Sequence, residues 1–184
     1  MKTRSEKGGE LPEGFLYQED FLSEEEEQRL LRIFTELPFE TFEYKGFQAK
    51  RRVLAYGWTY DFNTNKLSRA VEIPAFLLPL RERAALPAGV AADDFVEALL
   101  TEYGAGAQIN WHRDLTIFGK IAGISLGSSC TFRFKPSDKE GAAVSVVLAP
   151  RSLYVMEGVA RWQYQHSIPP VKELRYSITF RTLR

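Results

Sequence analysis

The chain has 184 residues, of which 45% are hydrophobic and 26% charged, as in an ordinary globular domain and unlike a disordered or collagen-like chain. Lys plus Arg and Asp plus Glu both number 24, so the net charge is zero and only a local basic patch could hold a nucleic acid. No run of about 18 apolar residues occurs, and the single cysteine, Cys130, cannot form an internal disulfide. We therefore expect a monomer in the reducing cytoplasm, without a membrane span.

The N-terminal residues show no periodic pattern of hydrophobic side chains. Residues 1–13 alternate charge, glycine and proline, which predicts a flexible tail, followed by a single domain over 14–184. A helix is predicted to begin at Ser23, with Glu26 completing a capping box and further glutamates matching the positive end of the helix dipole. The apolar face of this helix comprises Leu30, Phe34 and Leu37.

The middle of the chain mixes strand and helix signals. β-branched and aromatic residues predict a strand over Arg52–Tyr60, in which Tyr56, Trp58 and Tyr60 share a face, and Asp61–Asn65 is a polar turn. The segments Ile73–Arg83 and Asp94–Tyr103 are predicted to be helical or mixed, with prolines as punctuation.

The second half of the chain is rich in strand patterns. Helices first and many short strands later predict an α+β domain whose β part is a sandwich or barrel. The predicted strands are Gln108–Asp114, Ile121–Leu126, Cys130–Lys135, Val144–Ala149, Ser152–Met156 and Leu174–Thr182.

A histidine and an aspartate two positions apart carry the first chemical signal. In an extended segment, His112 and Asp114 point to one face while Arg113 points away. With the distant His166 they form the set of two histidines and one carboxylate that is typical of non-heme Fe(II) oxygenases and leaves positions open for a cosubstrate and dioxygen. The spacing alone is also compatible with a surface salt bridge or a capped turn, and the same ligands suit a zinc hydrolase.

A strand near the end of the sequence carries the second signal. Alternation over Leu174–Arg181 places Arg175, Ser177, Thr179 and Arg181 on one face and apolar residues on the other. The two arginine Cα atoms would lie roughly 20 Å apart, so that their side chains could bracket a small dicarboxylate such as a five-carbon keto diacid. The alternative is that both arginines form surface ion pairs.

Six segments of the chain resemble one family, the AlkB family of Fe(II)- and 2-oxoglutarate-dependent dioxygenases, over roughly residues 50–184. The resemblance implies a double-stranded β-helix, or jelly-roll, core with flanking N-terminal helices. The segments that carry it are Ile73–Leu80, Glu102–Gly106, Trp111–Asp114, Gly123–Gly127, Thr131–Phe134 and Arg175–Arg181.

The resemblance also implies roles for individual residues. His112, Asp114 and His166 would bind Fe(II) and so form the catalytic centre. Arg175 would pair with the distal carboxylate of 2-oxoglutarate, and Arg181 would lie near the metal-proximal end. Dioxygen is the remaining reactant.

Two positions depart from the family pattern. The family usually has Asn-x-Tyr before a glycine turn, where this chain has Thr101, Glu102 and Tyr103. Tyr103 carries over as a cosubstrate contact, and Thr101 offers a shorter hydrogen-bonding side chain. Ser177 similarly stands where the family often has Asn, which changes the cosubstrate packing but keeps the charge pairs.

The resemblance implies oxidative demethylation of N-alkylated bases in DNA or RNA, as in alkylation repair, with release of formaldehyde, succinate and CO2. A base extruded into such a site needs aromatic stacking, and its phosphates need cations. Arg51, Arg52, Tyr56 and Trp58 could supply both, but they could equally be a strand core and a solvated basic rim.

Other functions stay open at this point. One is the same oxygenase chemistry on a tRNA or on a protein side chain. Another is a noncatalytic nucleic-acid-binding module, against which the intact set of metal-binding and arginine residues argues.

Overall fold

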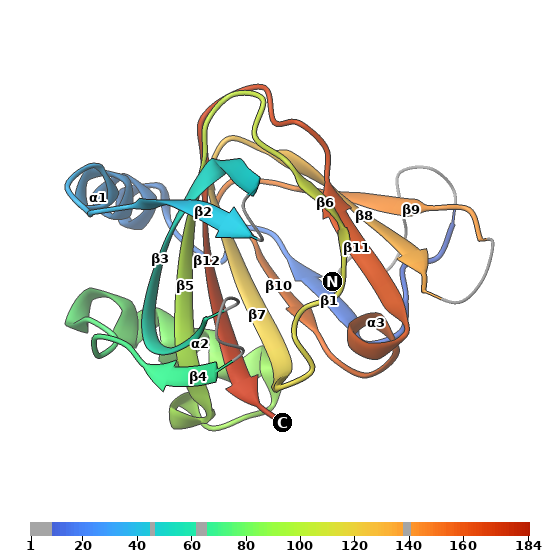
Figure 1. Cartoon of the computed structure of the whole chain (residues 1–184), viewed down its shortest axis with the longest axis horizontal. Helices are drawn as coiled ribbons and strands as arrows, with labels where there is room; N and C mark the ends of the chain where they lie inside the picture. Colours follow the sequence, from blue (N-terminus) through green and yellow to red (C-terminus); the bar gives the residue numbers. More distant parts are fainter. Residues whose placement is uncertain (1–8, 45–46, 62–65, 138–140) are drawn as a thin grey trace.

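The computed structural model of the chain describes residues 9–44, 47–61, 66–137 and 141–184. Two β-sheets face each other, and the helices lie at their margins (Figure 1). The helices are α1 (Glu24–Thr35), α2 (Leu78–Ala88) and α3 (Gly158–Trp162), with short 3₁₀ turns at Ala75–Leu77 and Ala92–Asp94. None of the helices in these described ranges has the length and apolarity of a membrane span.

The larger sheet is antiparallel and has eight strands. These are β1 (Phe15–Gln18), β2 (Glu40–Tyr44), β3 (Phe47–Asp61), β4 (Lys66–Arg69), β5 (Phe95–Tyr103), β7 (Phe118–Gly127), β10 (Leu153–Met156) and β12 (Arg175–Leu183). Their order is β1-β10-β7-β12-β5-β3-β2, and β4 pairs with β3. The long strand β12 therefore lies at the centre of the sheet, between β7 and β5.

The smaller sheet has the order β6-β11-β8-β9. Its strands are β6 (Ile109–His112), β8 (Cys130–Pro136), β9 (Val144–Leu148) and β11 (Tyr164–Ile168). Cys130, Phe132 and Phe134 are buried, whereas Thr131 and Arg133 are partly exposed, which confirms the predicted alternation in this strand. The apolar side chains face the larger sheet, so the space between the two sheets is closed by aromatic packing on this side.

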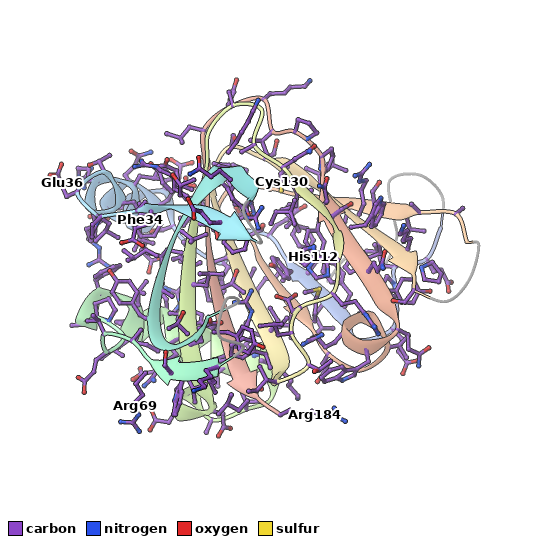
Figure 2. The ribbon with its side chains drawn as sticks, in the orientation of Figure 1. Phe34, Glu36, Arg69, His112, Cys130 and Arg184 are labelled. Carbon is purple, nitrogen blue, oxygen red and sulfur yellow. The ribbon has the colours of Figure 1, made fainter. Side chains whose placement is uncertain are left out.

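The outer face of the larger sheet packs against α1 and α2. The predicted capping box is confirmed: the Ser23 hydroxyl accepts from the Glu26 N–H at 3.1 Å, and the Glu26 carboxylate accepts from the Ser23 N–H at 2.9 Å. Leu30 and Phe34 are each 1% exposed in the core on this side, where Figure 2 labels Phe34, and Leu37 packs against that core. The inner face of the sheet is thereby left for a site.

Two predictions about local structure are wrong. The segment Asp94–Tyr103 is not helical or mixed: from Phe95 it forms β5, which is hydrogen-bonded on both sides by β12 and β3. A central strand with both faces covered lacks the clean polar–apolar alternation that identifies a strand in a sequence. The predicted tail is too long, because Leu11 and Pro12 are buried; residues 1–8 and most of the predicted turn Asp61–Asn65 lie outside the described part.

The other predicted strands are confirmed, with ends shifted by a few residues. Arg52–Tyr60 lies within β3, and Leu174–Thr182 corresponds to β12. On β12, Tyr176, Ile178 and Phe180 belong to the helix-side core, which places the alternate residues on the inner face as predicted.

Candidate functional site

The two histidines and the aspartate predicted as metal ligands come together between the sheets. His112 and His166 are directly paired across β6 and β11, and their ring centroids lie 4.3 Å apart. Asp114 follows two residues after His112, and its Oδ2 lies 3.2 Å from His166 Nε2. One ligand atom from each of the three residues lies within 4.8 Å of the others, and Figure 2 labels His112 in the middle of the molecule.

The surroundings of His112 prepare it as a neutral ligand. Its Nδ1 lies 2.8 Å from the Asn110 carbonyl oxygen, so Nδ1 carries the proton and Nε2 is left with a free lone pair. Burial, followed by the neighbouring His166, lowers the pKa of His112 to about 4. The imidazole is therefore neutral, with a single proton on Nδ1, near neutral pH.

Asp114 is held as a carboxylate. Burial by itself would raise its pKa, but Arg181 and the hydrogen bond with His166 outweigh burial and hold the pKa well below its usual range. Arg181 donates from Nη2 to Asp114 Oδ1 at 2.8 Å. Two imidazoles beside an ionised carboxylate are the donor set that suits Fe(II).

Arg181 does not have the free guanidinium that the bracketing hypothesis requires. It also donates from Nη1 to Glu97 Oε2 at 2.6 Å, and the Glu97 side chain is 5% exposed. Burial raises the pKa of Glu97, and Arg181 opposes that shift. The two arginines are therefore not equivalent: Arg181 orients Asp114, which places it at the metal end, while Arg175 is left to pair with a carboxylate.

Arg175 is buried at the opposite end of the inner face, with 1% exposure. Its Nε donates to the Ser125 hydroxyl at 3.2 Å, and its guanidinium carbon lies 4.8 Å from the centroid of the Tyr103 ring. Tyr103 pairs directly with Arg175, and Thr101 pairs directly with Ser177, so the four residues form two rows across β5 and β12. The structure thus brings together all of the predicted cosubstrate residues on one face.

Two buried polar atoms test whether this face suits a dicarboxylate. Arg175 Nη1 and Arg181 Nε have no hydrogen-bond partner within the described ranges. A buried guanidinium without an anion is costly, because its desolvation is not offset. The unpaired donors fit the carboxylate oxygens of 2-oxoglutarate, and the three metal ligands fit Fe(II).

A further residue, Arg161, connects the two chain segments that carry the metal ligands. It is 3% exposed and donates to the carbonyls of Leu115, Phe118 and Gly119 at 2.8 to 2.9 Å. Leu115 belongs to the loop that follows Asp114, Phe118 and Gly119 begin β7, and Arg161 itself lies in the helix before His166. Sequence analysis missed it, since an arginine that binds backbone carbonyls leaves no motif.

The predicted substrate-binding arginines differ in position. Arg51 lies opposite Tyr103 on the inner face, and its guanidinium carbon is 4.1 Å from the centroid of the Phe42 ring. Burial lowers the pKa of Arg51, and its charge contributes to lowering the pKa of His112. Arg52 points to the helix side, where it forms a two-bond ion pair with Glu102, so its assignment to the substrate site is wrong.

The two aromatic residues predicted to bind substrate also lie in different places. Tyr56 is 9% exposed within the helix-side core, because β3 alternates and Arg51 already points inward. Its assignment to the substrate site is therefore wrong. Gly57, with φ of 77°, interrupts the alternation of side chains along β3. Beyond it, Trp58 pairs with Arg69 of β4, and the Arg69 guanidinium carbon lies 5.4 Å from the Trp58 ring centroid.

Two residues of the site, Glu97 and Ser125, were also missed by sequence analysis. Glu97 shares a face with Thr101 and Tyr103 at a spacing of two, so a correct strand assignment for Asp94–Tyr103 would have indicated it. Ser125 lies on the strand Ile121–Leu126, which was predicted correctly, but nothing in the sequence links it to Arg175.

Comparisons with known proteins agree with this site. A family model described as the 2OG-Fe(II) oxygenase superfamily matches residues 14–181. The chain is 30% identical over 170 residues to the tRNA (carboxymethyluridine(34)-5-O)-methyltransferase ALKBH8 of Mus musculus, with 88% of this chain and 25% of that protein covered. It is 27% identical over 175 residues to the Alkylated DNA repair protein ALKBH8 homolog of Arabidopsis thaliana, with 82% and 49% covered.

The chain thus spans a quarter to a half of the length of these relatives. Among solved structures, that of OsALKBH1 matches with a TM-score of 0.75 and 15% identity, and covers 92% of this chain and 96% of that one. This match confirms the predicted α+β class, with a jelly-roll core and flanking helices.

Proposed function

The chain belongs to the AlkB family of the 2OG-Fe(II) oxygenase superfamily, and from this membership we propose that it oxidatively demethylates N-alkylated bases in DNA or RNA. The family works with Fe(II), 2-oxoglutarate and dioxygen. The observation that carries the proposal is the convergence of His112, Asp114 and His166 within 4.8 Å. Arg175, with its unpaired donor, lies on the facing sheet.

The assignment of the site residues follows from this geometry. His112, Asp114 and His166 would hold the iron, and Arg175 with Tyr103 would hold the distal carboxylate of 2-oxoglutarate. Thr101 and Ser177 lie in the next row and would complete the polar lining. When bound, iron and cosubstrate supply the oxidising power that hydroxylates an N-methyl group as 2-oxoglutarate becomes succinate and CO2.

Residues around the site orient the metal ligands and limit the access of water. Arg181 fixes the carboxylate of Asp114, and the Asn110 carbonyl fixes the tautomer of His112. The hydroxylated methyl group then leaves as formaldehyde and restores the unmodified base, so no protein acid or base is required for that step. Aromatic packing around His166, whose ring lies 5.3 Å from that of Phe132, limits the access of water.

Substrate contacts are proposed for two residues. Arg51 lies on the inner face and forms no hydrogen bond or ion pair within the part of the chain that the structure describes, so its charge is available for a phosphate. Trp58 is partly exposed and could stack on a base, as in single-strand recognition. The net charge of zero makes such local contacts necessary.

The names of these relatives favour nucleic acid over protein as the substrate. One names a tRNA methyltransferase and another names alkylated DNA repair. A tRNA base is therefore the second candidate, with the same oxygenase chemistry. We further propose a monomer in a reducing, cytoplasmic compartment, because Cys130 is buried and free.

The test is a turnover assay with methylated oligonucleotides. Anaerobic protein is loaded with Fe(II), then given air, 2-oxoglutarate and single-stranded DNA, RNA or tRNA that carries N-methyl bases. We expect formaldehyde and succinate in equal amounts, and none from Asp114→Ala, which loses a metal ligand. Succinate from Asp114→Ala at the wild-type rate would contradict the iron site, and demethylation of peptides alone would contradict the nucleobase proposal.

A further inference from the structure

Tyr154 is a buried tyrosine on the inner face that the assignments above leave unused. It lies on β10 and is 8% exposed. Its ring packs against Phe132 at 5.2 Å and Phe15 at 6.1 Å between centroids. Tyr154 is therefore held between the two sheets, on the side where the metal ligands and the arginines converge.

A glycine on the neighbouring strand lets the Tyr154 ring extend across the sheet. Tyr154 is paired with Gly123 of β7, and a Cβ atom on Gly123 would lie 2.2 Å from Tyr154 Cζ and 2.5 Å from its hydroxyl oxygen. The ring thus covers the backbone of Gly123, and the hydroxyl points toward β12. No residue with a side chain could stand at position 123 while the ring keeps this place.

The pairing of β7 with β12 shows which part of β12 the Tyr154 hydroxyl is directed toward. Gly123 is paired with Thr179, so the row Tyr154, Gly123, Thr179 crosses the sheet between Arg175 and Arg181. Thr179 is four residues from one arginine and two from the other. The phenol is thus directed into the interval between the two guanidiniums.

Two of the donors around this interval are unpaired. Arg175 Nη1 and Arg181 Nε are buried and have no hydrogen-bond partner within the described residues. Burial raises the pKa of Tyr154, so the phenol keeps its proton and is a donor. The two unpaired guanidinium N–H groups, with the phenol directed between them, fit a ligand with several acceptor oxygens.

We propose that Tyr154 is a cosubstrate-binding residue whose hydroxyl donates a hydrogen bond to a carboxylate oxygen of the dicarboxylate between Arg175 and Arg181. Gly123 provides the space for the ring, so the two residues act as a pair. The inference rests on the proposed cosubstrate role of Arg175. It does not depend on which nucleic acid is the substrate.

The experiment measures binding of N-oxalylglycine, a 2-oxoglutarate analogue, to the Mn(II)-loaded full chain by isothermal titration calorimetry, without nucleic acid. Tyr154→Phe keeps the ring and removes the hydroxyl, and we expect the Kd to rise about tenfold, the usual scale for a hydrogen bond to a charged group. The melting temperature without N-oxalylglycine stays at the wild-type value. Tyr176→Phe, which loses a 3.2 Å bond to Glu102 on the helix side, is the matched control with an unchanged Kd.

A second pair of variants tests the glycine. Gly123→Ala displaces the ring, so both the melting temperature and the affinity for N-oxalylglycine should fall. Adding Tyr154→Leu to Gly123→Ala relieves the clash, which restores the melting temperature and leaves the affinity low.

Three results would overturn the inference: an unchanged Kd in Tyr154→Phe, an equal loss in Tyr176→Phe, or wild-type affinity in the double variant. If the wild type binds no N-oxalylglycine at all, the role of Arg175 is wrong as well. If it binds the analogue normally but demethylates no base, only the proposed nucleobase substrate is wrong.

Discussion

Arg175 and Arg181 stand six positions apart on one strand, and their surroundings make them chemically different. Arg181 lies between two buried carboxylates, Glu97 and Asp114, at 2.6 and 2.8 Å. Arg175 donates to the Ser125 hydroxyl and lies beside the Tyr103 ring, and it forms no ion pair with any residue that the structure describes. Because a buried charge needs an opposite charge, Arg175 is the residue whose neutralisation awaits an anionic ligand.

Replacing Arg175 by Lys keeps the charge and removes the forked donor geometry. We expect the KM for 2-oxoglutarate to rise about tenfold while kcat changes little, since uniform binding is lost. Steady-state succinate formation at varied 2-oxoglutarate measures both constants. Arg52→Lys, on the outer face and paired with Glu102, is the control and should leave the KM unchanged. A wild-type KM in Arg175→Lys would mean that another group binds the carboxylate.

At the scale of elements, the site depends on how strands and loops are joined. The pairing of β6 with β11 sets His112 beside His166, and the contacts of α3 with residues 115–119 fix the segment that follows Asp114. The position of β12 between β5 and β7 places its polar residues opposite the metal ligands. Because alternate side chains of a strand point to the same face, the polar residues at every second position of β12 together line one side of the site.

Arg161 supports that segment with three hydrogen bonds. Arg161→Met removes all three, and we expect the free energy of unfolding to fall by about 3 kcal/mol, at about 1 kcal/mol per bond. Urea denaturation measures the loss, and Mn(II) affinity should weaken as the loop loosens. The exposed Arg69→Met is the control, with an expected change within about 0.5 kcal/mol; an Arg161→Met protein as stable as this control would contradict a structural role.

The capping box of α1 makes a separate, pH-dependent contribution. Ser23→Ala should lower the free energy of unfolding by about 1 kcal/mol. The pKa of Glu26 is lowered below its ordinary 4.5 by the hydrogen bond from the Ser23 backbone and by Arg83. The ionised form therefore favours the folded state, and its contribution is complete above pH 4.5 and is lost as the pH falls through the lowered pKa.

The measurement is urea denaturation between about pH 3 and pH 7, with Glu26→Gln as the comparison. The difference in stability between the wild type and Glu26→Gln should shrink as the solution is acidified. A difference that stays constant over this range would show that the Glu26 carboxylate contributes nothing to the cap.

At the scale of the whole molecule, the site lies between two sheets that have separate strand orders. The metal-ligand histidines belong to the smaller sheet, and Arg175 and Arg181 belong to the larger one. A metal with a dicarboxylate would therefore link the two sheets. Any such ligand that binds only the folded state stabilises the whole protein by mass action.

We expect Mn(II) with N-oxalylglycine to stabilise the fold by about 2.7 kcal/mol at a free concentration of 100 times the Kd. Differential scanning calorimetry with and without both additives measures the shift in melting temperature. Asp114→Ala, which lacks one ligand, should show little shift. A comparable shift in that variant would mean that the additives bind elsewhere.

The sequence by itself determined the features that depend on neighbouring residues. The capping box at Ser23, the His112-x-Asp114 spacing and the alternation from Arg175 to Arg181 are set by the periods of helix and strand, which act within a few residues. From these, and from the family resemblance, the metal ligands and the cosubstrate residues could be assigned.

Only the tertiary structure decided which residues meet across strands. Glu97 binds Arg181 from 84 positions away, and Tyr154 lies over Gly123, because strand order and register brought them together. The same register turned Arg52 and Tyr56 away from the site. Pairing between strands joins distant segments through backbone bonds that any side chain permits, so these contacts leave no local pattern in the sequence.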